Sequence, residues 1–278
     1  MKGPTALGRF CFVFAAVLLC PGSPRAQLSK LDEIGERVAA KLKDLGPNPA
    51  LVKVADFVPT DSTYSPQGHY LAWYFSGSLQ RYGKDFLLIG DHIQFDNELT
   101  NINHPPNAPW TLEALRAASP PIAADFVVFG TLEKRESSYF LDFHAVRISS
   151  GAVVVSELAE LHSSEFLESL SAPPLKTSGS PEPTAGVNGV SMPSCIHCPD
   201  PDYSDTARAA KINGTSVLLV RISPQGTAEG IRPYRLIGYG LDEQAYNAVK
   251  RWKFKPALDR DGNPVSVVIP VETTFRQN

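Results

Sequence analysis

The sequence has few cysteines and methionines and no long hydrophobic run. Four cysteines and two methionines occur among 278 residues, which excludes a small scaffold built on many disulfides. The longest apolar run, Phe10–Cys20, would rise only about 16 Å as a helix, about half of a bilayer core. The formal net charge is −3, so composition gives no reason to expect nucleic acid or an anionic membrane as a partner.

The chain also lacks the residue patterns that carry most enzyme chemistry. No nucleophile elbow, paired carboxylate motif or P-loop occurs. Gly238-Tyr-Gly240 lacks the third glycine of a dinucleotide-binding loop, because Glu243 stands at that position, and we interpret it as a turn. Histidines outside the segment 195–198 are dispersed without metal-ligand spacing. We therefore expect no catalytic residue, cofactor, metal site or small-molecule substrate.

Residues 1–26 have the pattern of a secretory signal peptide. Lys2 and Arg9 precede the apolar run, and small residues follow it, which is the order of charge and hydropathy in such signals. Cleavage is expected after Gly22 or Ala26, and the mature protein is expected to be exported.

Residues 27–170 alternate between helical and strand periods. Apolar spacing predicts helices at 29–45, 69–82 and 110–118. Short β-branched and aromatic runs predict strands at 51–58, 86–89, 126–132, 139–148 and 152–158. The segment 96–109, rich in Asn and Pro, is predicted to be a loop. The order β-α-β-α-β-β-β indicates a mixed sheet covered by helices.

Three segments in this region resemble the N-terminal domain of TolB-like envelope proteins. They are VKVADFVPTDS at 52–62, AADFVVFGTLEKRESSYFLDFHAVRISSG at 123–151, and the helix GHYLAWYFSGSLQ between them. The resemblance covers about 120 residues. It implies a mixed α/β sandwich that binds a partner protein and carries no catalytic constellation.

Residues 171–201 change composition and contain a pair of cysteines. Seven prolines stand among Ser, Thr and Gly, which predicts a linker that is flexible or partly polyproline II. Cys195 and Cys198 are the cysteines left after signal removal, in an oxidising compartment. We expect a local disulfide between them. The alternatives are a thiol pair that exchanges with a partner, and a zinc site with His197 whose fourth ligand is not visible.

Residues 202–278 read as a second α+β unit. A short helix is predicted at 203–210, and strands at 215–222, 227–237 and 266–275. Pro233 inside the second strand suits an edge or a bulge. A helix is predicted from Leu241 to Val249, with Asp242 as its cap. The result is a three-stranded antiparallel sheet with two helices.

This last unit is similar to the TonB C-terminal family over about 75 residues. The matching motifs are GYGLDEQA, VKRWKFKPA and GNPV before a strand ending in Phe. Ser204, where the family usually has proline, and Tyr246, where many members have a small residue, depart from the pattern. The family's last strand accepts a short peptide from outer-membrane transporters, so the resemblance implies a peptide-binding edge here. Its expected residues are Val265, Ser266, Val267, Val268, Ile269, Val271, Thr273 and Phe275.

The two resemblances imply a non-enzymatic protein of the periplasm or cell envelope of a Gram-negative-type bacterium, with a role linked to transport across the outer membrane. Expected partners are envelope proteins, including peptides of TonB-dependent transporters, and the edge strand could instead pair within the protein or in a homodimer. The family's energy transducers keep a membrane helix, whereas the apolar run here is short. A scaffolding adaptor without energy transduction is therefore the first alternative, and a thiol-redox role of Cys195 and Cys198 is the second.

Overall fold

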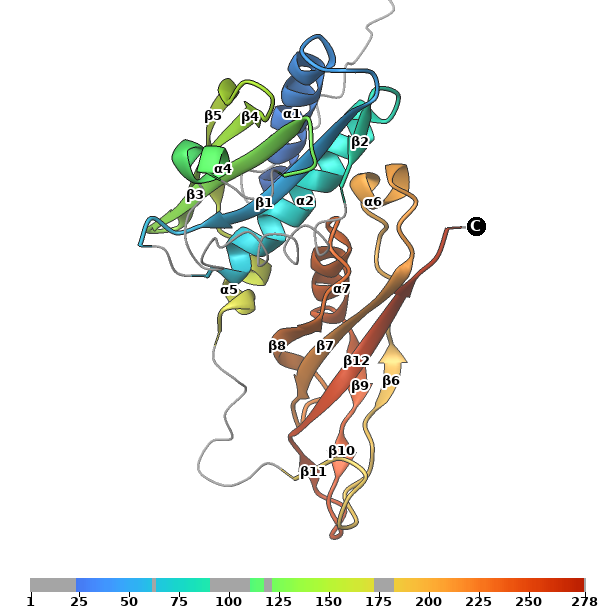
Figure 1. Cartoon of the computed structure of the whole chain (residues 1–278). Coiled ribbons are helices and arrows are strands. Elements are labelled where there is room, and N and C mark those ends of the chain that lie inside the picture. The colour runs from blue at the N-terminus through green and yellow to red at the C-terminus, as the bar shows by residue number, and fades with distance from the viewer. Residues whose placement is uncertain (1–23, 62–63, 91–110, 118–121, 173–182, 278) are drawn as a thin grey trace, which may run out of the picture.

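The computed structural model describes residues 24–61, 64–90, 111–117, 122–172 and 183–277. Most of the predicted signal peptide and the predicted loop 96–109 lie outside these ranges. The described residues form two α+β parts that lie against each other (Figure 1). We call them the N-terminal sandwich, from α1 to α5, and the C-terminal module, from β6 to β12. Within the described ranges, no helix combines the length and apolar character needed to cross a membrane.

The N-terminal sandwich has one five-stranded mixed sheet, as its element order predicted. The strand order is β2-β1-β3-β4-β5, with β1 parallel to β2 and β3 and the remaining pairs antiparallel. Within the N-terminal sandwich, helix α5 was not predicted from the sequence. The elements are α1 (Pro24–Lys43), β1 (Ala50–Val58), α2 (Pro66–Gly83), β2 (Leu87–Ile89), α4 (Leu112–Ala117), β3 (Phe126–Arg135), β4 (Ser138–Arg147), β5 (Ala152–His162) and α5 (Glu165–Leu170).

Helices α1 and α2 cover one face of this sheet, and α4 lies on the other (Figure 1). The Ser65 hydroxyl caps α2 by accepting from the Gly68 N–H at 3.1 Å, and Pro66 follows at the first helical position. A Cβ on Gly68 would lie 1.6 Å from the Phe57 carbonyl oxygen. Only glycine therefore lets α2 approach β1 this closely, and the Phe75 and Phe143 rings pack 5.0 Å apart beneath it.

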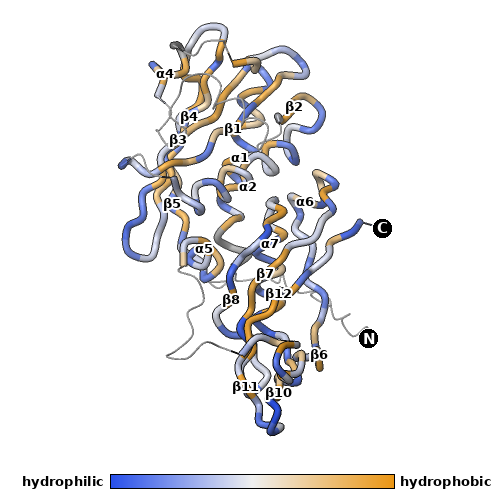
Figure 2. Tube along the Cα trace, turned by 60° about the horizontal axis from the view of Figure 1, so that its bottom comes forward, coloured by the Kyte–Doolittle hydropathy of each residue, from blue (hydrophilic) through white to orange (hydrophobic). Residues whose placement is uncertain are grey.

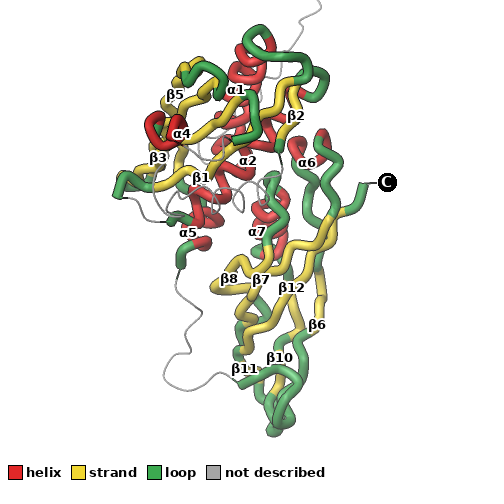
Figure 3. The backbone as a smooth tube through the Cα atoms, viewed as in Figure 1, coloured by secondary structure: helices red, strands yellow, loops and turns green. Residues whose placement is uncertain are grey.

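The C-terminal module is built on a three-stranded antiparallel sheet in the order β12-β7-β8. Its strands extend away from the helices that meet the N-terminal sandwich (Figure 3). The register between β7 and β8 shifts beside Pro233, which confirms the predicted irregular edge. The elements are β6 (Ser194–His197), α6 (Asp205–Ala209), β7 (Gly214–Ile222), β8 (Ala228–Arg235), α7 (Leu241–Val249), β9 (Lys253–Lys255), β10 (Ala257–Leu258), β11 (Pro264–Val265) and β12 (Val267–Phe275).

The proline-rich range 171–201 is partly folded onto the C-terminal module. Residues 183–201 are described, and β6 within them pairs antiparallel with β9. Val190 packs against the core, and the Ser191 N–H donates to the Leu258 carbonyl at 2.8 Å. A linker that is flexible or partly polyproline II was expected over the whole range, whereas β6 within it is a strand paired with β9. Backbone hydrogen bonds hold this segment against the module, although the segment has few apolar side chains of its own.

The two parts share one buried hydrophobic cluster. Helix α2 meets the turn before α7, where the Trp73 and Tyr239 rings lie 6.3 Å apart. A Cβ on Gly77 would lie 2.2 Å from the Tyr239 ring, and one on Gly238 would lie 2.5 Å from the Trp73 ring. Gly238 also has a φ of +82°, which favours glycine. Figure 2 shows the apolar character of β7 and β12 and the hydrophilic tip beside β10 at the end far from the junction.

Replacement of Tyr246 by alanine is expected to destabilise the protein by about 3 kcal/mol, because it empties a buried aromatic site. Tyr246 is 7% exposed, and its ring lies 5.8 Å from that of Phe166 in α5. Urea unfolding followed by fluorescence measures the change. The matched control is Tyr234→Ala on β8, where the side chain is 72% exposed and a change within about 0.5 kcal/mol is expected. Equal losses from both variants would contradict a buried junction.

Candidate protein-binding site

Strand β12 forms one edge of the C-terminal sheet. It pairs with β7 from Val267 to Phe275 without a register shift, and it has no sheet neighbour on its other side among the described strands. An open edge presents a row of backbone N–H and C=O groups that an extended peptide can pair with. This edge is the geometric basis of the candidate site.

Half of the residues that the sequence predicted for this site have buried side chains. Val267, Val271, Thr273 and Phe275 are at most 6% exposed and face the core, so their side chains are not available at the edge. Val268 and Ile269 are half-buried. Two of the predicted residues lie before the strand. Val265 belongs to β11, where it pairs with Ala257 of β10, and Ser266 connects β11 to β12.

The solvent-facing side chains of β12 were missed. Pro270, Glu272 and Thr274 are exposed, and the two-residue period of a strand could have identified them, since they alternate with the buried set. Pro270 also indicates the orientation of the backbone. A proline is tolerated in a sheet where its missing N–H would face away from the neighbouring strand. Glu272 and Thr274 lie two and four residues after Pro270, so their backbone N–H and C=O groups point to the same side of the strand. We therefore expect these groups to point to the open edge.

The Asp242 carboxylate stabilises the turn before α7 rather than capping the helix. The helix begins at Leu241, and its N-cap is Gly240 in the left-handed region. The Asp242 oxygens accept from the N–H groups of Ile237 and Gly238 at 2.7–3.1 Å and from the Ser216 hydroxyl at 2.7 Å. The predicted cap is thus corrected. Burial raises the pKa of Asp242 to about 6, and these hydrogen bonds oppose the rise.

Glu243 is the buried acid at the junction of the two parts. Its side chain is 3% exposed, and burial raises its pKa to about 8, against an opposing hydrogen bond from Ser164. Ser164 is the N-cap of α5, so this contact joins the C-terminal module to the N-terminal sandwich. Sequence reasoning missed this residue, because a carboxylate in the first turn of a helix is ordinarily solvated and is stabilised there by the helix dipole.

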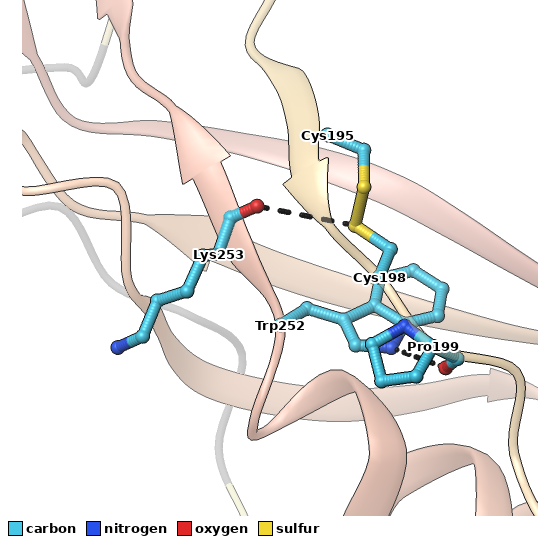
Figure 4. The surroundings of a disulfide bond; sticks show 5 residues. All are labelled: Cys195, Cys198, Pro199, Trp252 and Lys253. Carbon is cyan, nitrogen blue, oxygen red and sulfur yellow. Dashed lines mark hydrogen bonds between the residues drawn. A yellow bond between two sulfur atoms is a disulfide. The ribbon is translucent and has the colours of Figure 1, made fainter.

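Cys195 and Cys198 are joined in a disulfide with an S–S distance of 2.07 Å, which is the local pairing expected from the sequence. Figure 4 shows the bond at β6, beside the exit of α7. The Trp252 indole N–H donates to the Pro199 carbonyl at 2.9 Å, and the Cys198 sulfur lies 4.0 Å from the Lys253 carbonyl. The bond therefore lies where β6 is held against β9. Among the described residues, no group of three His, Cys, Asp or Glu side chains is placed to hold a metal ion.

The sequence of the C-terminal module matches a known protein family. Residues 199–276 match the family model of the Gram-negative bacterial TonB protein C-terminal region. The match includes all of α6, β7, β8, α7 and β12, and thus the open edge. We call this part the TonB-like module from here on. A comparison with curated proteins finds no match for the chain.

Some solved structures share parts of the arrangement at low similarity. The LpoB C-terminal domain from Salmonella enterica is 12% identical over 48% of this chain and 98% of its own, with a TM-score of 0.36. The solution structure of E. coli LpoB is 12% identical over 58% of this chain and 82% of its own, with a TM-score of 0.35. The solution structure of the Pseudomonas aeruginosa TonB CTD is 19% identical over 36% of this chain and 99% of its own, with a TM-score of 0.27. These scores are too low to support a functional conclusion.

Both departures of the TonB-like module from its family pattern lie at the junction. The Ser204 hydroxyl caps α6 by accepting from the Ala207 N–H at 3.1 Å, and it donates to the Tyr239 carbonyl at 2.5 Å. Tyr246 packs edge-to-face against Phe166 of α5. The resemblance to TolB-like domains at 52–62 and 123–151 is not confirmed by these comparisons, and it stays an interpretation of the sequence.

Glu243→Gln is expected to change how stability depends on pH. The folded chain binds the Glu243 proton more tightly than the unfolded chain does, since the pKa rises from 4.5 to about 8 on folding. The contribution of this group to the free energy of unfolding therefore falls as pH rises through that window. The fall is on the order of a few kcal/mol.

Urea unfolding of the wild type and Glu243→Gln at pH 5 and pH 8.5 measures this contribution. The wild type should lose more stability between the two pH values than the variant does, because glutamine has the same shape and does not titrate. Two parallel pH profiles would show that Glu243 is ionised in the folded protein.

Proposed function

We propose that this chain is a non-enzymatic protein of the cell envelope of a Gram-negative-type bacterium that binds an extended peptide by strand addition at the outer edge of β12. The observation that carries the proposal is the edge itself: β12 pairs with β7 alone among the described strands. The family match at residues 199–276 supports it. Short segments of envelope proteins are the partner class, and N-terminal peptides of outer-membrane transporters are the first candidates by resemblance.

Strand addition at β12 would use the half of the strand after Pro270. Proline has no N–H to give to an added strand, so a continuous row of outward donors begins only beyond it. Glu272 and Thr274 would supply two N–H groups and their carbonyls, and their exposed side chains lie beside the path of the peptide. In this geometry the backbone provides affinity, and alternate side chains of the peptide provide specificity.

Replacement of Glu272 by proline is expected to weaken peptide capture at least about tenfold, because it removes an outward N–H while leaving the pairing with β7 in place. The matched control is Glu272→Ala, which removes the exposed side chain and keeps the N–H, and which should change capture less than about twofold. A photo-crosslinking residue at Thr274 in the full-length protein, expressed in its native envelope, measures capture by mass spectrometry of the linked peptide. The same crosslinker at Tyr234 on β8, the opposite edge, is expected to give no specific product.

The identity of the linked peptide separates the two candidate roles. An N-terminal segment of an outer-membrane transporter supports a link to transport, whereas segments of other envelope proteins support a scaffolding adaptor. Equal capture by Glu272→Pro and Glu272→Ala, with both variants folded by circular dichroism, would overturn strand addition. Capture of a second copy of this chain would replace it with a homodimer through β12.

A further inference from the structure

A cavity of about 250 Å³ lies at the junction between α1 and α2 of the N-terminal sandwich and α6 and α7 of the TonB-like module. Its lining includes the carboxyl groups of Asp32, Asp205 and Glu243 and contains no Lys, Arg or His among the described residues. Asp205 is 64% exposed and Glu243 is 3% exposed. The cavity therefore reaches from solvent beside Asp205 to a buried carboxyl group.

The buried Glu243 side chain has an unused oxygen. Its Oε1 atom is inaccessible to solvent and has no hydrogen-bond partner among the described residues. An unpaired buried carboxyl oxygen is unfavourable by itself, because its hydration is lost without compensation. A donor that enters the cavity would supply the missing hydrogen bond.

The Tyr74 hydroxyl in the cavity wall is already engaged in two hydrogen bonds. The Tyr74 hydroxyl donates to Asp32 Oδ2 at 3.0 Å and accepts from Thr206 at 3.4 Å. Arg81 approaches Asp32 and Asp205 only to 3.7 and 3.9 Å, which leaves the acidic character of the cavity incompletely balanced. A cationic hydrogen-bond donor is the chemistry that this lining favours.

The arrangement suits an organic cation better than a metal ion. The described acidic side chains do not converge in a group of three that could coordinate a metal. They are distributed around a cavity that also has the apolar side chain of Leu28 and the rings of Tyr74 and Tyr203 in its wall. An apolar and aromatic wall contacts an alkyl chain, and an aromatic face attracts a cation.

We propose that this junction cavity binds a primary ammonium group on a short alkyl chain, with Glu243 and Asp32 as its acceptors. The ammonium is carried by a free small amine or by a lysine side chain of a partner, and both present the same three donors. This site is separate from the β12 edge and does not depend on strand addition. Binding at the junction would contact both parts of the chain and hold them together.

The proposal predicts that binding releases a proton. Glu243 has a pKa of about 8, so at neutral pH it holds its proton, and an ammonium bound beside it would favour the ionised form. The titratable and charged groups around the cavity are Asp32 of α1, the Tyr70 and Tyr74 phenols and Arg81 of α2, Asp205 of α6, and Asp242 on the same helix as Glu243. Binding of an ammonium at pH 7 should therefore release close to one proton, and affinity should rise with pH up to about 8.

Isothermal titration of the full mature chain with n-butylamine, with the blocked tripeptide acetyl-Gly-Lys-Gly-amide and with tetramethylammonium tests the proposal. Butylamine, the lysine peptide or both should bind at one site, whereas tetramethylammonium, which has no N–H donor, should not. Titration at pH 7 in two buffers of different ionisation enthalpy measures the proton release. Binding of butylamine indicates a free amine, and binding of the lysine peptide alone indicates a partner's side chain.

Glu243→Gln and Asp32→Asn should each weaken binding at least about tenfold, and Glu243→Gln should also abolish the proton release. The matched control is Glu33→Gln, which removes an equal charge from an exposed position of α1 next to Asp32 and should leave affinity unchanged. Thermal unfolding verifies that all variants fold. The absence of binding by both butylamine and the lysine peptide, or equal weakening by Glu33→Gln, would overturn the site, and neither result would affect capture at β12.

Discussion

The fold depends on the burial of α7 on two sides. Leu241, Ala245 and Val249 face the C-terminal core, whereas Glu243 and Tyr246 face the N-terminal sandwich. A helix that packs between two structures has few polar positions that remain in water, so an acid on its outer face loses hydration. The packing of α7 between the two parts therefore accounts for the raised pKa of Glu243 and for the cavity beside it.

Two side chains of the TonB-like module stabilise the junction. Tyr246 fills space against Phe166 where a small residue would leave a cavity, and Ser204 links the start of α6 to the turn at Tyr239. Neither residue contacts the β12 edge. The junction and the candidate binding edge therefore depend on different residues of the module.

The local structure could be predicted from the sequence, and the junction could not. The hydrophobic periods of two and 3.6 residues predicted the bounds of the strands and helices to within a few residues. Each period arises because one face of an element contacts its own core. The choice of the last strand as the binding edge came from the family resemblance, and the strand order places that strand at an edge of the sheet. Glu243 could not be identified, because its environment comes from α5 and α2, which lie about 80 and 170 residues earlier in the chain. The pairing of β6 with β9 was missed for the same reason, since a strand held by backbone bonds needs no apolar pattern.

The end of β12 and the junction cavity share α6 as a neighbour. The Phe275 ring packs edge-to-face against Tyr203, which lines the cavity, and the Gln277 amide donates to the Arg208 carbonyl at 2.9 Å. A peptide at the edge would order the strand that these contacts hold, and an ammonium in the cavity would order α6 from its other side. Any energetic coupling between the two would have to be reciprocal. The peptide would then raise the affinity of the cavity by the same factor by which the ammonium raises the affinity of the edge.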